Sequence, residues 1–199
     1  MTLVERRPAE IARDSGPVLA TERLMLRAPR LSDAKAVATL VNDRRIAENT
    51  TRIPYPYSLA DAEDFIAKAA HAEAETAFAI TLARGRLIGM CGLDRPRGGE
   101  PEIGYWLGVP FWGEGYATEA VRALLDYAFE DLALDRVTAG ARVSNPASRR
   151  VLEKCGFQWS SVVLTRIRAM ASSAPVDRFR LDRRLWTSLK RWGSVKRMT

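Results

Sequence analysis

The stretch W-G-E-G-Y-A-T-E-A, Trp112 to Ala120, joins two closely spaced glycines to the start of an amphipathic helix. The apolar residues of this helix recur at Ala117, Ala120, Val121, Leu124, Leu125, Ala128 and Leu132. The first turn of a helix carries about four backbone N–H groups without an intrahelical partner, at the positive end of the dipole. Gly113 and Gly115 have no Cβ, so an anion can approach the backbone closely. The stretch therefore predicts a phosphate or pyrophosphate site, with a simple tight turn as the alternative.

Two familiar phosphate-binding motifs do not match this stretch. The dinucleotide-binding fingerprint requires a third glycine at the position of Thr118. The P-loop pattern G-x-x-x-x-G-K-[ST] does not occur in the chain. The predicted anion site therefore belongs to a fold other than these two.

Length and composition indicate one globular domain. The chain has 199 residues, of which 47% are hydrophobic and 28% charged, as is typical of a folded domain with a full core. No apolar run approaches the roughly 18 residues that a membrane span needs. The charged start of the chain also lacks the apolar centre of a secretory signal, so we expect a cytoplasmic protein. The net charge of +7 suits an anionic partner, although solubility alone explains it as well.

The chain offers few residues for metal binding or covalent catalysis. Cys91 falls in an apolar strand pattern, and Cys155 lies beside the end of a predicted helix. The single histidine, His71, falls in a charged, alanine-rich helix. We therefore expect no bound metal and no Ser-His-Asp triad, with a covalent thiol intermediate as a minor alternative.

Periodicity predicts alternating strands and helices. Strands are expected over 23–27, 78–82, 87–93, 102–107, 136–143, 162–167 and 179–185. Ser32 and Asn145 are the expected N-caps of two helices, and Pro146 and Gly156 mark the first turn and the end of the second. This order predicts an α/β fold with a mixed sheet and helices on both faces.

The chain divides into three expected parts. Residues 1–20 form an N-terminal extension, 21–186 the domain, and 187–199 a basic C-terminal tail. Leu185, Leu189 and Trp192 recur at helical spacing among the basic residues of the tail region. Such a helix lies on a membrane or RNA surface, or packs its apolar side on the domain. We expect the second arrangement.

Three more motifs surround the glycine stretch. E-I-G-Y-W-L (102–107) precedes it, R-V-T-A-G-A-R-V (136–143) follows its helix, and S-N-P-A-S-R-R-V-L-E-K-C-G-F (144–157) comes next. In combination they resemble the GCN5-related N-acetyltransferase (GNAT) superfamily, and within it the ribosomal-protein-alanine N-acetyltransferase (Rim-type) branch. The resemblance covers about residues 22–186. It implies a GNAT fold, with a central mixed, mostly antiparallel sheet of about seven strands, and acetyl transfer from acetyl-CoA to an amine.

The resemblance also implies an acetyl-CoA site. The family pattern Q/R-x-x-G-x-G/A falls on residues 112–117, with Trp112 in the first position, as is common in the Rim-type branch. Loop N–H groups are implied to hold the phosphates, and the backbone of 105–107 the pantetheine arm and thioester carbonyl. The implied cofactor-binding residues are Tyr105, Trp106, Leu107, Trp112, Gly113, Glu114, Gly115, Tyr116, Ala117, Thr118, Asn145, Ser148 and Arg149. Core packing for Tyr105 and Leu107, and helix capping for Asn145, are the alternatives.

Glu102 is the candidate catalytic base. It alternates with Gly104 and Trp106 on one face of its strand, where similar acetyltransferases place a catalytic glutamate. A carboxylate near the amine helps to remove its proton, directly or through a water. The alternatives are a solvated strand end for Glu102, and Glu100 or Asp94 as the base.

Ser148 is the candidate proton donor to the leaving thiolate. Many family members use a tyrosine two residues before the lysine of E-K-x-G-F, but this chain has Leu152 there. Ser148 matches a serine to which Rim-type enzymes give this role. Both catalytic assignments are implied by the resemblance.

The sequence leaves the acceptor open. The first hypothesis is the N-terminal amine of a protein, the second is a small amine such as an antibiotic, a polyamine or an amino acid, and the third is a non-catalytic protein that binds RNA or the ribosome. We expect the acceptor site between residues 53–57 and the last strands; a peptide requires an open groove there. The positive charge suits coenzyme A and a possible association with the ribosome. A monomer and a homodimer both fit the sequence.

Overall fold

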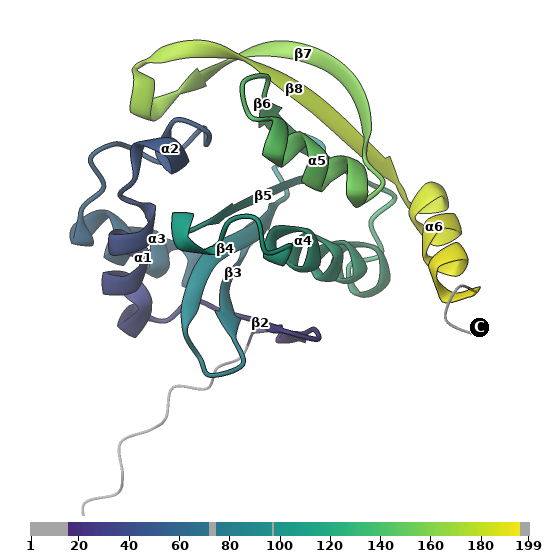
Figure 1. The fold of residues 1–199 in the computed structure, drawn as a ribbon, viewed down its shortest axis with the longest axis horizontal. Helices are drawn as coiled ribbons and strands as arrows, with labels where there is room; N and C mark the ends of the chain where they lie inside the picture. Colours follow the sequence, from purple (N-terminus) through teal and green to yellow (C-terminus); the bar gives the residue numbers. More distant parts are fainter. Residues whose placement is uncertain (1–15, 72–74, 97, 196–199) are drawn as a thin grey trace, which may run out of the picture.

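The computed structural model describes residues 16–71, 75–96 and 98–195 and contains an eight-stranded sheet (Figure 1). The sheet order is β1-β2-β3-β4-β5-β6-β8-β7, and only β5 and β6 pair in parallel. The predicted mixed, mostly antiparallel sheet is confirmed. The strands are β1 (Leu19–Ala20), β2 (Leu24–Arg27), β3 (Glu75–Leu82), β4 (Leu87–Asp94), β5 (Glu102–Leu107), β6 (Arg136–Arg142), β7 (Gln158–Ile167) and β8 (Ser172–Asp182).

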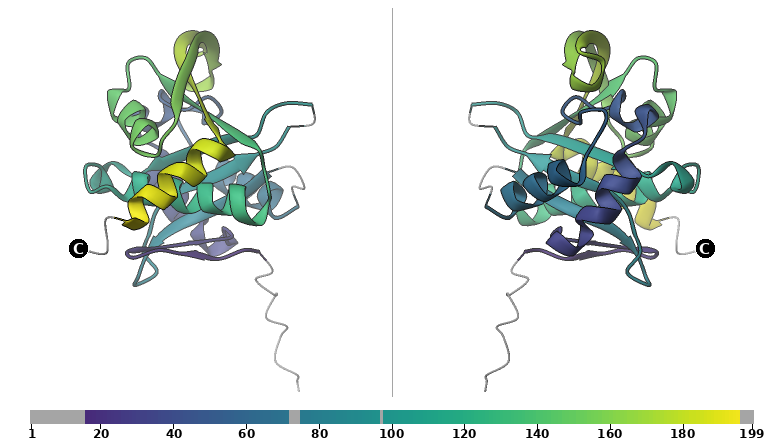
Figure 2. Two further views of the ribbon diagram at one scale, coloured as in Figure 1. Left: turned by 90° about the vertical axis from the view of Figure 1, so that its right-hand side faces the viewer. Right: turned by 90° about the vertical axis from the view of Figure 1, so that its left-hand side faces the viewer.

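Helices cover both faces of this sheet, as predicted. In Figure 2, one view has α6 in front and the opposite view has α1 and α3 in front. The helix that follows the glycine stretch, α4, continues into a π-helical turn that ends at Asp131. The helices are α1 (Ala34–Val41), α2 (Arg44–Ala47), α3 (Leu59–His71), α4 (Tyr116–Asp126), α5 (Pro146–Lys154) and α6 (Arg183–Val195).

Alternate strand residues face two different cores. On β3, Phe78 and Ile80 join the core with α4 and α5, while Ala79 joins the core with α1 and α3. The predicted apolar stripe of α4 is confirmed, because its central side chains are at most 1% exposed: Ala120, Val121, Leu124 and Leu125. Burial of this stripe fixes the start of α4 against the sheet.

The parallel pair β5–β6 separates after two residues. Glu102 pairs with Thr138 and Ile103 pairs with Ala139, whereas the rest of β5 pairs only with β4 on its other edge. Figure 1 shows β5 running between α4 and α5. Among the residues that the structure describes, no strand pairs with this second backbone edge of β5 from Gly104 to Leu107.

The start of α1 differs from the prediction. Ser32 lies inside a 3-10 turn, Leu31–Asp33, and does not cap the helix. The Asp33 carboxylate instead accepts the Arg30 N–H at 2.8 Å and pairs with Arg27 at 2.7 and 2.9 Å. This buried ion pair holds the turn that leads into α1, so the prediction for Ser32 was wrong.

The C-terminal region also differs in its boundaries. The last strand ends at Asp182, and Leu185 belongs to α6 rather than to a strand. Trp186 packs on the ring of Phe129 with a centroid distance of 5.1 Å, and Leu185 contacts the same core. The expectation that the apolar side packs on the domain holds for these residues. The side chain of Trp192, residues 1–15 of the predicted extension and 196–199 of the predicted tail lie outside what the structure describes.

None of the helices in the described ranges is long and apolar enough to cross a membrane.

Candidate active site

A cavity of about 1040 Å³ lies where β5 separates from β6. Its walls come from the starts of α4 and α5, from β5, from α2 and α3, and from β6 and β8. Most of the predicted site residues line it together: Glu102, Tyr105, Trp106, Leu107, Trp112, Gly113, Gly115, Tyr116, Ala117, Thr118, Asn145 and Ser148. Glu114 and Arg149 are not among the residues that line it.

The glycine loop has the backbone that close approach of an anion requires. Gly113 has φ +83° and Gly115 has φ +81°, a region that side chains with a Cβ rarely adopt. A Cβ at Gly113 would meet no atom within 4 Å, so the space beside this residue is open. Gly115 is the N-cap of α4 and provides no side-chain cap. The N–H groups of the first turn of α4 are therefore available to an anion.

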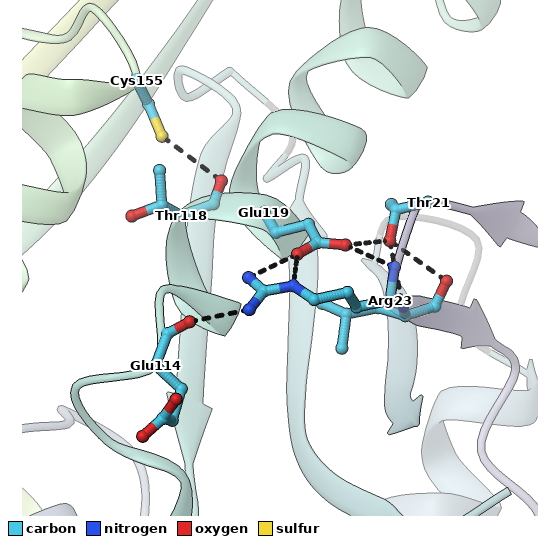
Figure 3. Close-up of polar contacts among 7 residues, drawn as sticks. Thr21, Arg23, Glu114, Thr118, Glu119 and Cys155 are labelled. Carbon is cyan, nitrogen blue, oxygen red and sulfur yellow. Dashed lines mark hydrogen bonds and ion pairs between the residues drawn. The ribbon is translucent and has the colours of Figure 1, made fainter. Parts of the chain in front are cut away.

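A network from the turn between β1 and β2 holds this loop in place (Figure 3). Arg23 pairs with Glu119 at 2.7 Å, donates to the Glu114 carbonyl at 3.0 Å, and lies 4.6 Å from the centroid of the Tyr116 ring. The Thr21 hydroxyl donates to Glu119 at 2.6 Å. Burial opposes ionisation of Glu119, but the hydrogen bonds from Thr21 and Arg23 outweigh it and lower the pKa of this carboxyl. The Glu119 charge is thus held by Arg23.

Trp112 connects the loop to β5. Its indole Nε1 donates to the Leu107 carbonyl at 2.8 Å, so this carbonyl already has a partner. The guanidinium of Arg45 on α2 lies 5.9 Å from the centroid of the Trp112 ring and also lines the cavity. Arg45, which also pairs with Asp43 at 2.7 Å, thus lies beside the loop, where Trp112 replaces the usual Gln or Arg of the family pattern.

Helix α5 and its N-cap contribute four polar or basic side chains to the cavity: Asn145, Ser148, Arg150 and Lys154. Asn145 caps the helix, as predicted, and its side chain accepts the Ser148 N–H at 3.1 Å. Arg150 and Lys154 line the cavity from the same helix. Arg149 pairs with the buried Asp177 on β8, at 3.2 Å, and is not among the residues that line the cavity, so its cofactor contact stays a prediction.

Tyr105 and Ser148 meet through their hydroxyl groups, which lie 2.9 Å apart. The alternating pattern of β5 places Tyr105 on the face that α5 covers, with Ile103 and Leu107. Burial raises the pKa of Tyr105 well above its ordinary value, although the Ser148 hydrogen bond opposes this. Leu152, in the position of the usual family tyrosine, is fully buried.

Glu102 projects into the cavity from the start of β5 and forms a two-point ion pair with Arg178 on β8. The Oε1–Nη1 distance is 2.8 Å and the Oε2–Nη2 distance is 3.0 Å. Asp94, which pairs with Glu102 in the β4–β5 register, also lines the cavity, 3.5 Å from Arg52. Glu100 pairs with Arg136 on the surface and does not line the cavity.

The structure offers no reactive thiol at this site. Both cysteines are buried, and burial raises the pKa of Cys155 to about 11 and raises that of Cys91 further. Cys155 directs its sulfur toward the Thr118 carbonyl at 3.7 Å (Figure 3). Within the described ranges, no three His, Cys, Asp or Glu side chains form a group suited to a metal ion.

Sequence reasoning missed three arginines that shape the site: Arg23, Arg45 and Arg178. Each comes from an element far from the glycine loop in the sequence. No local pattern marks them, because exposed arginines are common in a chain with 31 basic residues.

These features fit acetyl-CoA. The uncapped start of α4 suits its phosphates, with Arg45, Arg150 and Lys154 among the cavity residues. The free edge of β5 suits the amide groups of a pantetheine arm, since an extended chain can pair with an unpartnered strand edge. The same cavity is also lined by Glu102.

Comparisons with known proteins agree with this fit. Residues 23–158 match the family model for the acetyltransferase (GNAT) domain. The "Uncharacterized N-acetyltransferase p20" of Bacillus licheniformis is 33% identical over 146 residues, which cover 70% of this chain and 82% of p20. The "Putative ribosomal N-acetyltransferase YdaF" of Bacillus subtilis is 52% identical over 56 residues, 28% of this chain and 31% of YdaF.

A solved structure extends the comparison to the cofactor. Spermidine N-acetyltransferase from Vibrio cholerae, in complex with CoA and spermine, has a TM-score of 0.72 and 25% identity. The match covers 84% of this chain and 99% of that one. The chain therefore belongs to the GNAT acetyltransferase family and is an acetyl-CoA-dependent N-acetyltransferase.

Proposed function

We propose that the acceptor is the N-terminal amine of a protein or peptide. The observation that carries this proposal is the charge balance at the acceptor end of the cavity, which Arg52, Tyr57, Asp94, Glu102, Arg142, Arg168 and Arg178 line. Two of the carboxylates there have basic partners, since Glu102 pairs with Arg178 and Asp94 pairs with Arg52. Asp61, which also lines the cavity, accepts from the hydroxyl and the backbone N–H of Ser58. A polypeptide carries backbone dipoles and side chains of both charge signs. It therefore suits a cavity wall that contains both acidic and basic side chains.

A polyamine is the second candidate, because the Vibrio cholerae spermidine N-acetyltransferase has the same fold and was solved with spermine. A polycation requires an excess of carboxylates at its binding site. Here Asp64 pairs with Lys68 at 2.5 Å, and Arg142 and Arg168 add positive charge to the same cavity. The described acceptor end therefore favours the peptide. The likeness over 56 residues to YdaF, which is named a putative ribosomal N-acetyltransferase, supports the same choice.

The chemistry of the acceptor agrees with the site. An α-amino group loses its proton near pH 8, whereas an aliphatic amine keeps its proton up to about pH 10.4. The α-amine thus requires less help from a base. We assign that help to Glu102, whose carboxylate lies in the cavity within reach of solvent, at 41% side-chain exposure.

The rest of the proposed reaction depends on how acetyl-CoA and the amine are bound and aligned. Acetyl-CoA supplies an activated acetyl group, and direct attack by the amine requires both reactants to be held together. The start of α4 holds the phosphates, and the free edge of β5 aligns the arm so that the acetyl group lies near Glu102. N–H groups at this edge stabilise the negative charge that develops on the carbonyl oxygen. Asn145 and Ser148 hold the cofactor from α5.

The test is the release of free thiol from acetyl-CoA with a panel of acceptors. The panel contains peptides that begin with Ala, Ser or Met, the same peptides with a blocked N-terminus, spermidine, aminoglycosides and free amino acids. We expect turnover with the free peptides and none with the blocked ones. Turnover with spermidine at a higher kcat/KM would contradict the proposal and establish the second candidate.

Residues 21–186 are the proposed catalytic domain, and we place the enzyme in the cytoplasm, where proteins are made. Association with the ribosome, through the basic surface of the chain, would bring the enzyme to its acceptors. Sedimentation of the purified protein with and without ribosomes tests this association. The sedimentation rate of the protein alone distinguishes a monomer from a homodimer.

A further inference from the structure

The Tyr105 side chain crosses from β5 to the first turn of α5. Its hydroxyl lies 2.9 Å from Ser148 Oγ and 3.2 Å from the Ser148 carbonyl oxygen, and both residues line the cavity. The sequence assigns Tyr105 only a backbone role in cofactor binding. The predicted backbone role therefore does not explain the hydrogen bond of the Tyr105 side chain.

Either hydroxyl can donate in this 2.9 Å contact, and the Tyr105 hydroxyl has a second acceptor in the Ser148 carbonyl at 3.2 Å. Burial favours the neutral form of Tyr105, so its hydroxyl keeps its proton and is able to donate. A serine hydroxyl carries one hydrogen and two lone pairs. When Tyr105 donates to a lone pair of Ser148 Oγ, the serine hydrogen remains available to the cavity. Leu152, one turn further along α5, offers no hydroxyl for this purpose.

We propose that Tyr105 is a positioning residue that directs the Ser148 hydroxyl toward the sulfur of the departing coenzyme A thiolate. During transfer, a bond forms between the amine nitrogen and the acetyl carbon, the C–S bond breaks, and its electron pair leaves on sulfur. The chain from Tyr105 O–H to Ser148 O–H to sulfur stabilises that charge. The proton that Glu102 takes from the amine in the proposed reaction reaches the thiolate through solvent, so Tyr105 and Ser148 both keep their protons. Ser148 then stabilises the thiolate and is not the proton donor that the resemblance implies. This role holds whichever amine is the acceptor.

The binary complex with coenzyme A tests the proposal without turnover. The ultraviolet absorbance of the thiolate, at one fixed alkaline pH, reports how much of the bound thiol is ionised. We expect Tyr105→Phe and Ser148→Ala each to lower the ratio of thiolate to thiol about three- to tenfold, the effect of about one hydrogen bond. The affinity for desulfo-coenzyme A, which lacks the sulfur, remains unchanged. Tyr127→Phe removes a hydroxyl from a residue that does not line this cavity and is the matched control.

The double variant separates positioning from an independent role. If Tyr105 acts through Ser148, Tyr105→Phe has no further effect on kcat in the Ser148→Ala background. Equal effects of Tyr105→Phe in both backgrounds, or an unchanged thiolate ratio in Tyr105→Phe, would overturn the proposal. Ser148→Thr, which retains the hydroxyl, is expected to restore the ratio. Should Tyr105→Phe fail to fold, 3-fluorotyrosine at position 105 replaces it; this stronger donor should raise the ratio, and no rise would contradict the proposal.

Discussion

Glu102 on β5 and Arg178 on β8 form their two-point ion pair across the strand between them, β6. The pair passes over Gly140, where a Cβ would lie 3.1 Å from Arg178 Nη1 and 3.5 Å from Glu102 Oε1. A glycine at this position therefore leaves room for the two side chains to meet. The ion pair fixes the carboxylate at the start of β5, just before the open edge that begins at Gly104, where the proposed acceptor amine must arrive.

The first prediction concerns this carboxylate. Glu102→Gln keeps the size of the side chain but cannot accept a proton, so kcat should fall about 100-fold or more. The affinity for acetyl-CoA should change little, because the implied phosphate and pantetheine contacts are elsewhere. Thiol release and calorimetric titration measure the two quantities. Glu100→Gln, on the surface and outside the cavity, should leave kcat unchanged. Full turnover by Glu102→Gln would refute the assignment of the base.

The second prediction concerns the glycine loop. Gly113→Ala places a methyl group in the open space beside the loop and strains a residue at φ +83°. We expect a loss of about 1–2 kcal/mol of unfolding free energy and a weaker affinity for acetyl-CoA. Gly85→Ala is a matched control, because Gly85 has φ +78° and equally open space but lies in the β3–β4 turn. Both variants should lose similar stability, and only Gly113→Ala should bind acetyl-CoA more weakly.

The third prediction concerns the Arg23–Glu119 pair. Folding lowers the pKa of Glu119. Ionised Glu119 therefore stabilises the fold at pH values above 4.5, the ordinary pKa of this carboxyl. That stability is lost as the pH falls through the lower, folded value. Glu119→Gln should cost about 1 kcal/mol at neutral pH, since solvent partly screens the pair. Denaturant unfolding at several pH values measures the free energy of unfolding. We expect the difference in this free energy between wild type and variant to become smaller below pH 4.5. A constant difference across the acid range would contradict this account of the loop.

Local signals made much of the fold predictable. The two ends of α5 show why, because Asn145, Pro146 and Gly156 each act on the backbone within a few residues of themselves. The glycine loop is another such case, since its two positive φ angles depend on its own glycines. The hydrophobic period of α4 likewise determines which side is buried without reference to its neighbours.

Contacts between distant segments were not predictable in this way. Arg23 is 96 residues from Glu119, and Arg178 is 76 residues from Glu102, so neither pair appears as a spacing in the sequence. The failed prediction for Ser32 has a similar cause. Serine is a good N-cap in isolation, but the pair between Arg27 and the neighbouring Asp33 imposes a different turn. The structure was needed to show where the charges meet.

The last prediction tests whether α6 is part of the domain. Trp186 packs on Phe129, and Lys190 lies 4.8 Å from the centroid of the Trp186 ring while it pairs with Glu130 at 2.6 Å. Trp186→Ala removes a partly buried ring from this contact and should cost about 2–3 kcal/mol, less than for a fully buried tryptophan. Arg184→Ala changes an exposed side chain of the same helix and should leave the stability nearly unchanged. Thermal and denaturant unfolding measure both. If Trp186→Ala is as stable as wild type, α6 does not contribute to the core, and a surface role for this basic helix becomes the better account.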